Sequence, residues 1–245
     1  MNQPVQAKSE SAAPRRIGIS RYSTVEFLIA LGLLFMAAPF VEEIPHGDFI
    51  DGSLITIVLI SGVMAVGRRR TTLLLAVILV APVIIGRWLR LIWPDRIAHE
   101  FYLAPALIFV VFLIAHLLTF ILRAPRVNAE VLSAGIASYL LLGMAWMFAY
   151  LMVAKWVPDA FVFTAGPDSE HVLSGFNAYY FSFITLTTVG YGDIVPVNHV
   201  ARMLTTLEAI TGTLFMAILI ARLVSLYSSQ PPGADKADRQ TDSPS

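Results

Sequence analysis

Residues 188–193 combine residue types that could bind a metal cation through the backbone alone. They are, in order, Thr188, Val189, Gly190, Tyr191, Gly192 and Asp193, with glycine at alternate positions. Glycine tolerates the positive φ angles that most residues avoid, so a backbone of alternating conformation is accessible here. Such a backbone turns successive carbonyl oxygens to one side, and a row of these oxygens can replace the water shell of a cation. We therefore expect these carbonyls, with the Thr188 hydroxyl at one end, to form a cation site.

The rest of the sequence offers no competing catalytic chemistry. It has no phosphate-binding loop, no cluster of metal-ligating side chains and no serine nucleophile motif. Cysteine is absent, which excludes disulfides and thiolate metal sites. The formal net charge is +0 and the sequence pI is about 7.0, so no overall field attracts nucleic acid. We expect neither an enzyme nor a protein that binds a cofactor or nucleic acid.

The composition indicates an integral membrane protein. Hydrophobic residues make up 57% of the chain and charged residues only 14%, whereas soluble domains average about 25% charged residues. The apolar residues are gathered in long blocks. About 20 apolar residues in a helix, at a rise of about 1.5 Å each, span a hydrocarbon layer of about 30 Å.

Six apolar spans can be located in the sequence, and each is predicted to be helical because a lone span must satisfy its own backbone in lipid. They cover residues 24–41, 53–67, 71–93, 101–122, 131–157 and 199–227, of which the second is short. The first is longer than the apolar region of a signal peptide, so we expect it to be retained. The predicted fold class is all-α, with a four-helix membrane region at 24–123.

Residues 175–188 are apolar and aromatic but too short to cross a bilayer. Runs of about 10–14 such residues are typical of re-entrant segments. We therefore expect a short helix that dips into the membrane between the fifth and sixth spans and leads directly into residues 188–193.

The distribution of Lys and Arg predicts the orientation, because cytoplasmic loops carry an excess of them. Four basic clusters fall on one side if the N-terminus is cytoplasmic: Arg15, Arg16 and Arg21; Arg68, Arg69 and Arg70; Arg123 and Arg126; Arg222 and Lys236. The N-terminal tail 1–23 and the tail 228–245, predicted to be disordered, are then both cytoplasmic. We expect a multi-pass protein of the cell membrane, with lipid contacts at the arginines of 68–70.

Residues 187–193, Thr-Thr-Val-Gly-Tyr-Gly-Asp, resemble the selectivity filter of the potassium channel family at every position. The resemblance extends over 131–227, which corresponds to the outer helix, pore helix, filter and inner helix of a channel pore domain. It implies that K⁺ is the permeant ion and that these carbonyls face it: Thr188, Val189, Gly190, Tyr191 and, completing the filter, Gly192. The side chains of Val189 and Tyr191 would point away from the ion and pack against their surroundings.

The resemblance also implies a homotetramer, because one chain offers one filter loop and the family's filter needs four. Three further copies of the chain are therefore expected partners. Positions that match the family's filter supports are Thr185, Thr187, Asp193 and the aromatic residues Tyr179, Tyr180 and Phe181. We expect a hydrogen bond from Tyr180 to Asp193, with an interfacial position of the Tyr180 ring as the alternative. Some relatives keep a buried Glu behind the filter, whereas this chain has Ile184 there.

The last span carries two residues of special interest. Gly212 either allows the inner helix to bend or permits close helix packing. Glu208 is an acid within the span, where ionisable groups are costly and usually functional. It could influence gating or attract cations, but we favour a protonated or hydrogen-bonded acid between packed helices. By the resemblance, Thr213, Met216 and Ile220 line the cavity below the filter.

The first four spans lack the arginine ladder of a voltage sensor. His116 is the only basic residue of the fourth span, and Arg123 lies at the end of this span. Arg87 and Arg90 lie in the third span beside tryptophans and are interpreted as interfacial anchors. The chain is therefore similar to bacterial six-span channels without an arginine-rich voltage-sensor helix, and the sequence does not identify its gating stimulus.

Three alternatives to a potassium-selective channel remain from the sequence. A weakly selective cation channel would keep the same filter and also conduct Na⁺. A potassium-uptake transporter would need four such loops in one chain, whereas this chain has one. A non-conducting regulatory membrane protein would keep the pore domain without ion flow.

Overall fold

The computed structural model describes residues 24–41, 47–66, 70–93, 100–164, 173 and 175–228. The predicted tail 1–23 lies outside these residues, and so does the predicted tail 228–245 except for Ser228, which is the last residue of a helix. The described residues form α1 (Thr24–Val41), α2 (Gly47–Ala65), α3 (Arg70–Ile92), α4 (Glu100–Arg123), α5 (Ala129–Trp156), β1 (Phe161–Phe163), α6 (Gly175–Leu186), β2 (Ile194–Pro196) and α7 (His199–Ser228).

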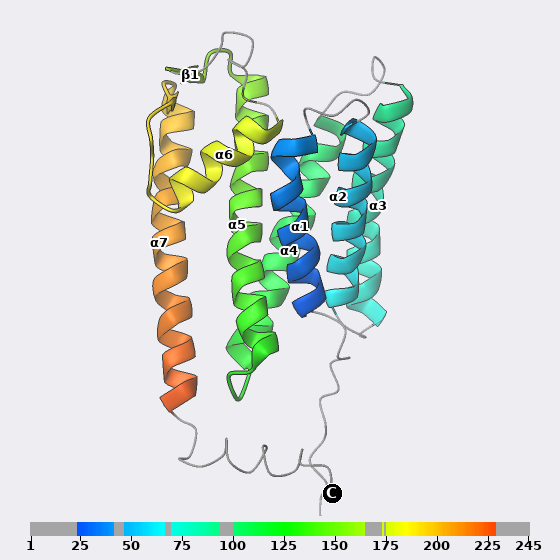
Figure 1. The fold of residues 1–245 in the computed structure, drawn as a ribbon, viewed down its shortest axis with the longest axis vertical. Coiled ribbons are helices and arrows are strands. Elements are labelled where there is room, and N and C mark those ends of the chain that lie inside the picture. Colours follow the sequence, from blue (N-terminus) through cyan, green and yellow to red (C-terminus); the bar gives the residue numbers. More distant parts are fainter. Residues whose placement is uncertain are drawn as a thin grey trace, which may run out of the picture.

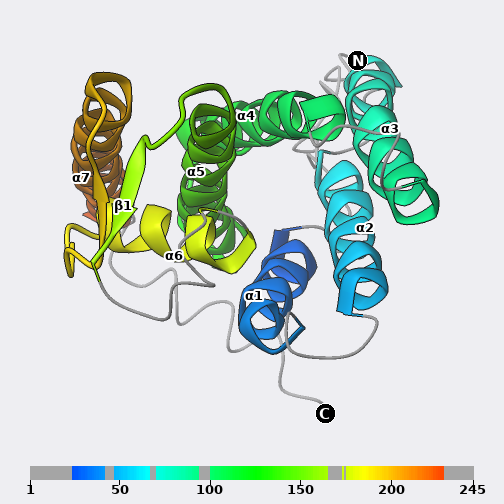
Figure 2. The same ribbon diagram turned by 90° about the horizontal axis from the view of Figure 1, so that it is seen from above.

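The long helices stand side by side, and the short helix α6 slants between them (Figure 1). Helices α1 to α4 form a group on one side of α5, while α7 stands on the other side. Seen from above, α6 reaches from α7 past α5 toward α1 (Figure 2). Helix α6 therefore has a neighbouring helix on each side, and these neighbours help to position the loop that follows it.

Four of the described helices are long and apolar enough to cross a membrane. These segments are Arg70–Ile92, Tyr102–Arg123, Ala129–Trp156 and His199–Ser228. The apolar parts of α1 and α2, Thr24–Phe40 and Phe49–Ala65, are shorter. The fold is thus a predominantly helical one with four clear candidate spans.

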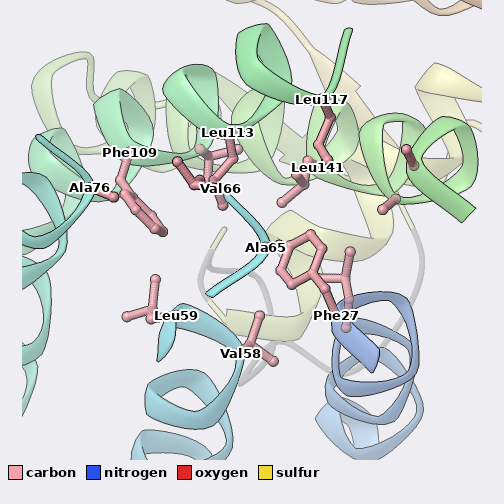
Figure 3. Close-up of a cluster of buried hydrophobic side chains, with 14 of the residues drawn as sticks. Phe27, Val58, Leu59, Ala65, Val66, Ala76, Phe109, Leu113, Leu117 and Leu141 are labelled. Atoms are coloured by element: carbon pink, nitrogen blue, oxygen red, sulfur yellow. The ribbon is translucent and has the colours of Figure 1, made fainter. Parts of the chain in front are cut away.

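A continuous apolar core joins α1 to α5. Phe27 from α1, Phe109 from α4 and Leu141 from α5 are almost completely buried in it, and Figure 3 shows these side chains converging between the helices. Helix α5 buries many small residues, among them Ala134, Ala137 and Ser138. Small residues let neighbouring backbones approach closely, so α1 and α4 pack tightly against α5.

Helix α2 begins at Gly47, earlier than the apolar span that the sequence predicts from residue 53. The additional turn contains Asp51, whose carboxylate forms an ion pair with Arg87 of α3. A charge with a partner on the next helix can be accommodated where an unpaired one would be excluded. Because Asp51 interrupts the apolar run, the sequence predicts a start for this helix that is too late.

Arg87 and Arg90 of α3 are bound to neighbouring helices. Besides the ion pair of Arg87, Arg90 Nη1 donates a hydrogen bond of 2.9 Å to Tyr102 Oη of α4. Trp88 Nε1 donates to Thr56 Oγ1 of α2 at 3.1 Å. These side chains connect α2, α3 and α4, and the interfacial anchoring inferred for Arg87 and Arg90 from the sequence stays a prediction.

Candidate functional site

Helix α6 leads into the candidate site, which is the loop at residues 188–193. It has 12 residues, which at about 1.5 Å per residue cover about 18 Å, much less than a bilayer of about 30 Å. Beyond its end, Thr188 N donates to Thr185 O at 2.9 Å, and the amides of Val189 and Gly190 both donate to Ile184 O. The last carbonyls of the helix are therefore satisfied by the loop itself, which fixes the direction in which the loop leaves.

The backbone of residues 188–192 alternates in the sign of φ. Thr188, Gly190 and Gly192 have φ of 60°, 51° and 80°, whereas Val189 and Tyr191 are not among the positive-φ residues. The two glycines adopt this conformation without steric cost. Thr188 does so as a non-glycine residue, a strained conformation that clusters at functional sites.

Four successive carbonyl oxygens in this loop are available to a ligand. Those of residues 188–191 accept no hydrogen bond from the part of the chain that the structure describes. The next carbonyl differs, because Gly192 O accepts a hydrogen bond of 2.9 Å from Thr164 Oγ1. Gly192, predicted as part of the filter, therefore shapes the turn here, and its carbonyl is engaged by the protein.

The two large side chains of the loop are uncovered in a single chain. Val189 is 52% exposed and Tyr191 is 74% exposed. A Cβ built on Gly190 or Gly192 would meet nothing within 4 Å. The packing expected around Val189 and Tyr191 is thus not supplied by the described residues of one copy.

Asp193 is held at the end of the loop. Tyr180 Oη donates to Asp193 Oδ2 at 2.6 Å, and the backbone amide of Ile194 donates to Asp193 Oδ1 at 3.1 Å. The hydrogen bond expected from the sequence is therefore present. Donation to Asp193, with smaller effects from burial and nearby charge, raises the pKa of Tyr180 to about 12, so its hydroxyl stays protonated at neutral pH.

A two-stranded ribbon, which the sequence analysis missed, fixes this same end. Strands β1 and β2 are antiparallel, with Val162 opposite Val195. The amide of Thr164, just after β1, donates to Asp193 O at 2.8 Å. Phenylalanine and valine in β1 and the β-branched Ile194 and Val195 in β2 were the available signal, but three residues per strand are too few for a pattern to stand out.

The aromatic residues of α6 support the loop from two directions. Phe181 is 2% exposed, and its ring lies 5.0 Å from that of Tyr150 in α5. Tyr179 faces the four-helix region instead, stacked at 5.1 Å on Phe35 of α1. The two threonines predicted as supports are bonded within the helix end: Thr185 is buried, and Thr187 Oγ1 donates to Phe183 O.

Glu208 of α7 lies between α5 and α6 and is completely buried. Tyr150 Oη of α5 is hydrogen-bonded to Glu208 Oε2. Ser182 Oγ of α6 lies 2.6 Å from Glu208 Oε1. The sequence identified the acid, but not these partners, which lie 58 and 26 residues away.

Gly212 lies one turn beyond Glu208 and touches the end of α6. A Cβ on Gly212 would come within 2.7 Å of both the carbonyl oxygen and Cδ1 of Leu186. Helix α7 runs unbroken through this position, from His199 to Ser228. Close packing explains the glycine in this structure, and its role as a hinge stays a prediction.

The residues predicted to line a cavity lie exposed on α7. Thr213, Met216 and Ile220 follow one another at helical spacing, and Met216 and Ile220 are 38% and 53% exposed. Further along, Arg222 Nη2 donates to Leu122 O at 2.8 Å and to Ala124 O at 3.2 Å. The sequence marked Arg222 only as a topology signal, because nothing local indicates that it reaches the end of α4.

The chemistry of the site is that of neutral oxygen ligands. Within the described ranges, no group of three or more His, Cys, Asp or Glu residues could hold a metal ion. The open carbonyls of 188–191 are instead four successive dipoles on a short loop. Such ligands suit a monovalent cation, which must be released again quickly.

Comparison with known proteins shows that this region is similar to known ion channels. Residues 139–229 match the model of an ion channel family. Over 49 residues, the chain is 47% identical to two-pore potassium channel 4 of Arabidopsis thaliana, covering 20% of this chain and 17% of that protein. Over 57 residues, it is 33% identical to the inward rectifier potassium channel Kirbac3.1 of Paramagnetospirillum magnetotacticum, covering 23% and 19%. Over 87 residues, it is 29% identical to human potassium voltage-gated channel subfamily A member 4, covering 36% and 13%.

These similarities cover only part of the chain. The chain spans less than a fifth of the length of these curated relatives, and no solved structure gives a significant match. Residues 139–229 are thus similar to an ion channel domain, and the apolar helices indicate a multi-pass membrane protein.

Proposed function

We propose that this chain is one subunit of a homotetrameric potassium channel, which lets K⁺ pass selectively and passively across the cell membrane. Four copies of residues 188–192 would surround the ion path on a common axis. The open carbonyls of residues 188–191 would replace the water shell of K⁺. Thr188 would add its hydroxyl at the inner end.

The observation that carries this proposal is the alternation of φ along residues 188–192. It explains why glycine occurs at every second position and why four carbonyls in a row lack a partner within the described chain. A loop on the surface of an ordinary protein would satisfy these groups with its own backbone or with water. The match to the ion channel family model includes the same residues.

Two features support assembly into a tetramer. The exposed side chains of Val189 and Tyr191 need a covering that a neighbouring copy can provide. Helix α7 also buries only a few of its 30 residues in the single chain, namely Ala201, Glu208, Gly212 and Leu226. A fourfold arrangement with α7 innermost would cover both, with Thr213, Met216 and Ile220 facing the central cavity.

In the topology that we propose, α1 to α5 and α7 cross the membrane and α6 is re-entrant. The short length of α6 and the placement of Arg and Lys on alternate loops support this topology, with both termini cytoplasmic. The chain then divides into a four-helix membrane region at 24–123 and a pore domain at 131–227. The shorter apolar parts of α1 and α2 fit a bilayer that thins locally around them.

Reconstitution into potassium-loaded vesicles tests the function directly. We expect vesicles that contain the wild-type protein to release K⁺. In mixed K⁺ and Na⁺ solutions, the current through the protein should reverse near the K⁺ equilibrium potential. A Gly190→Asp variant is the matched control, because φ of 51° disfavours any side chain there and four carboxylates would crowd the axis. A wild-type protein that is assembled but passes no K⁺ would refute the proposal.

The same measurement separates the alternatives. A reversal potential midway between those of K⁺ and Na⁺ would indicate a weakly selective cation channel. An intact cellular role for the Gly190→Asp variant would indicate a non-conducting regulatory protein. The subunit count is tested separately by the mass of the purified complex and by cross-linking of introduced cysteine pairs, since the native chain has no cysteine.

A further inference from the structure

The carboxyl of Glu208 is enclosed by two hydroxyl groups and a backbone carbonyl from different helices. Ser182 Oγ lies 2.6 Å from Glu208 Oε1 and 2.8 Å from Gly143 O of α5. The hydroxyl of Tyr150 contacts the other carboxyl oxygen. Glu208 and Ser182 are both 0% exposed, so bulk solvent does not reach these contacts.

The number of hydrogens in this cluster determines its protonation state. Three oxygen–oxygen contacts require three hydrogens, whereas Ser182 and Tyr150 supply one each. With an ionised Glu208, the contact from Ser182 to Gly143 O or to the carboxylate would lack a hydrogen. With a neutral Glu208, its own hydroxyl donates to Ser182 Oγ, and Ser182 in turn donates to Gly143 O. Tyr150 donates to the remaining carboxyl oxygen, and every contact is satisfied.

The charge around the cluster agrees with this assignment. Among the described residues, no Lys, Arg or His forms an ion pair with Glu208, and the ion pair that is present joins Arg87 and Asp51 elsewhere. The titratable groups nearest to Glu208 on the packed helices are Tyr139 and Tyr150 of α5, which supply no positive charge. An ionised carboxylate without a cation is far more costly to bury than a neutral acid.

The cluster is placed where it can control the filter. Ser182 lies one turn before Leu186, the last residue of α6, and the filter follows at once. Gly212, one turn beyond Glu208, is in close contact with the carbonyl of Leu186. Helix α7 therefore contacts the end of α6 at two successive turns, so that a displacement of the inner helix is transmitted to residues 187–192.

We propose that Glu208 is a neutral carboxylic acid that positions the pore helix on the inner helix and thereby holds the filter in its conducting form. This inference rests on the proposed function and adds a residue that acts through α6 without touching the ion. It differs from an acid that attracts cations to the pore, because a neutral acid contributes no charge.

Glu208→Gln and Glu208→Leu separate hydrogen bonding from charge. The amide of glutamine can donate to Ser182 and accept from Tyr150, so Glu208→Gln should keep the K⁺/Na⁺ permeability ratio and mean open time within about twofold of the wild type. Leucine has a similar size but removes the acceptor of the Tyr150 hydroxyl and the donor to Ser182 Oγ, while the bond from Ser182 to Gly143 O stays. We expect Glu208→Leu to shorten the mean open time about tenfold. Complexes are first checked for the wild-type assembled mass.

Ser182→Ala provides a second variant in case Glu208→Leu does not assemble, and it should shorten open times in the same direction. Tyr139→Phe is the matched control, since Tyr139 lies on α5 against Phe215 of α7 and is outside the cluster. Two results would overturn the proposal: an assembled Glu208→Gln complex as impaired as Glu208→Leu, or Glu208→Leu and Ser182→Ala complexes that match the wild type.

Infrared spectroscopy tests the protonation state without any ion flow. At neutral pH, the wild-type complex should show the C=O stretching band of a carboxylic acid, and Glu208→Gln should lack it. Absence of the band from the wild type would overturn the neutral acid. A wild-type complex that shows the band but passes no K⁺ would refute the proposed channel function and leave the protonation assignment standing.

Discussion

Replacing Tyr180 with phenylalanine should destabilise the conducting form of the filter. The change removes one hydroxyl, which donates to Asp193 Oδ2 at 2.6 Å. Among the bonds that the described residues make to its side chain, Asp193 then keeps the one from its neighbouring amide at 3.1 Å. A hydrogen bond to a charged group contributes about 1.5–3 kcal/mol, and partial exposure of this pair places the loss near the lower end. We expect a loss of about 1–2 kcal/mol, a factor of about 5–30 in the equilibrium between conducting and collapsed filters.

Single-channel recording of Tyr180→Phe in K⁺ is the appropriate assay. The mean open time should fall by roughly that factor, and the K⁺/Na⁺ permeability ratio should decrease. Tyr179→Phe is the matched control, because Tyr179 is the preceding residue of the same helix and its ring stacks on Phe35, away from the filter. Equal open times and selectivity in the two variants and the wild type would refute the reasoning.

The pH dependence of this contact has a definite sign. The folded pKa of Tyr180, about 12, lies above the ordinary value for tyrosine of about 10. A raised pKa means that the protonated form is the one that folding favours. The contribution of this hydrogen bond is therefore complete below about pH 10 and is lost as the pH rises toward 12. Open times recorded between pH 7 and 9 should show no change that depends on the Tyr180 hydroxyl.

Three further variants test other parts of the site. Gly212→Ala would place a Cβ within 2.7 Å of the Leu186 carbonyl oxygen and should lower stability by about 1–3 kcal/mol, measured as thermal unfolding in detergent. Gly32→Ala is the control and should leave stability unchanged, because a Cβ there would meet nothing within 4 Å. Equal melting temperatures for the two variants would exclude a packing role for Gly212. Thr164→Val removes the donor to the last filter glycine and should shorten open times several-fold, whereas unchanged kinetics would show that the ribbon does not brace the loop. Arg222→Gln loses the forked contact with the end of α4 and should alter open probability without changing selectivity; a change in reversal potential would contradict this.

The filter and its helix could be predicted from the sequence because their signals are local. A 12-residue apolar helix followed by glycine at alternate positions specifies a short segment and a backbone geometry together. The positive φ of Thr188 was not predicted, because threonine rarely adopts it. The alternation in the sign of φ therefore includes Thr188, a residue type that seldom has a positive φ. The hydrogen bonds from the loop to Ile184 O stabilise this conformation.

The partners of the filter could not be predicted, because they depend on how distant elements are rotated against one another. Thr164 reaches Gly192 across 28 residues of sequence. Tyr150 and Ser182 meet Glu208 only because three helices present the right faces at the same height. An acid in an apolar span signals a buried polar contact, but the sequence does not say which helix supplies it. Asp51 shows the same limit, since its partner Arg87 lies on the next helix.

The four-helix region is joined to the proposed ion path at two separate places. Phe35 of α1 stacks on Tyr179 of the pore helix, and Arg222 of the inner helix is bonded to the carbonyls of Leu122 and Ala124 at the end of α4. The first contact leads to the filter and the second to the far end of α7. Because the acceptors at α4 are backbone carbonyls, a movement of α4 relative to α7 must either carry Arg222 along or break both bonds. A stimulus that acts on α1 to α4 therefore has a physical route to each end of the pore without a separate sensor domain, and variants of Phe35 and Arg222 would distinguish the two routes.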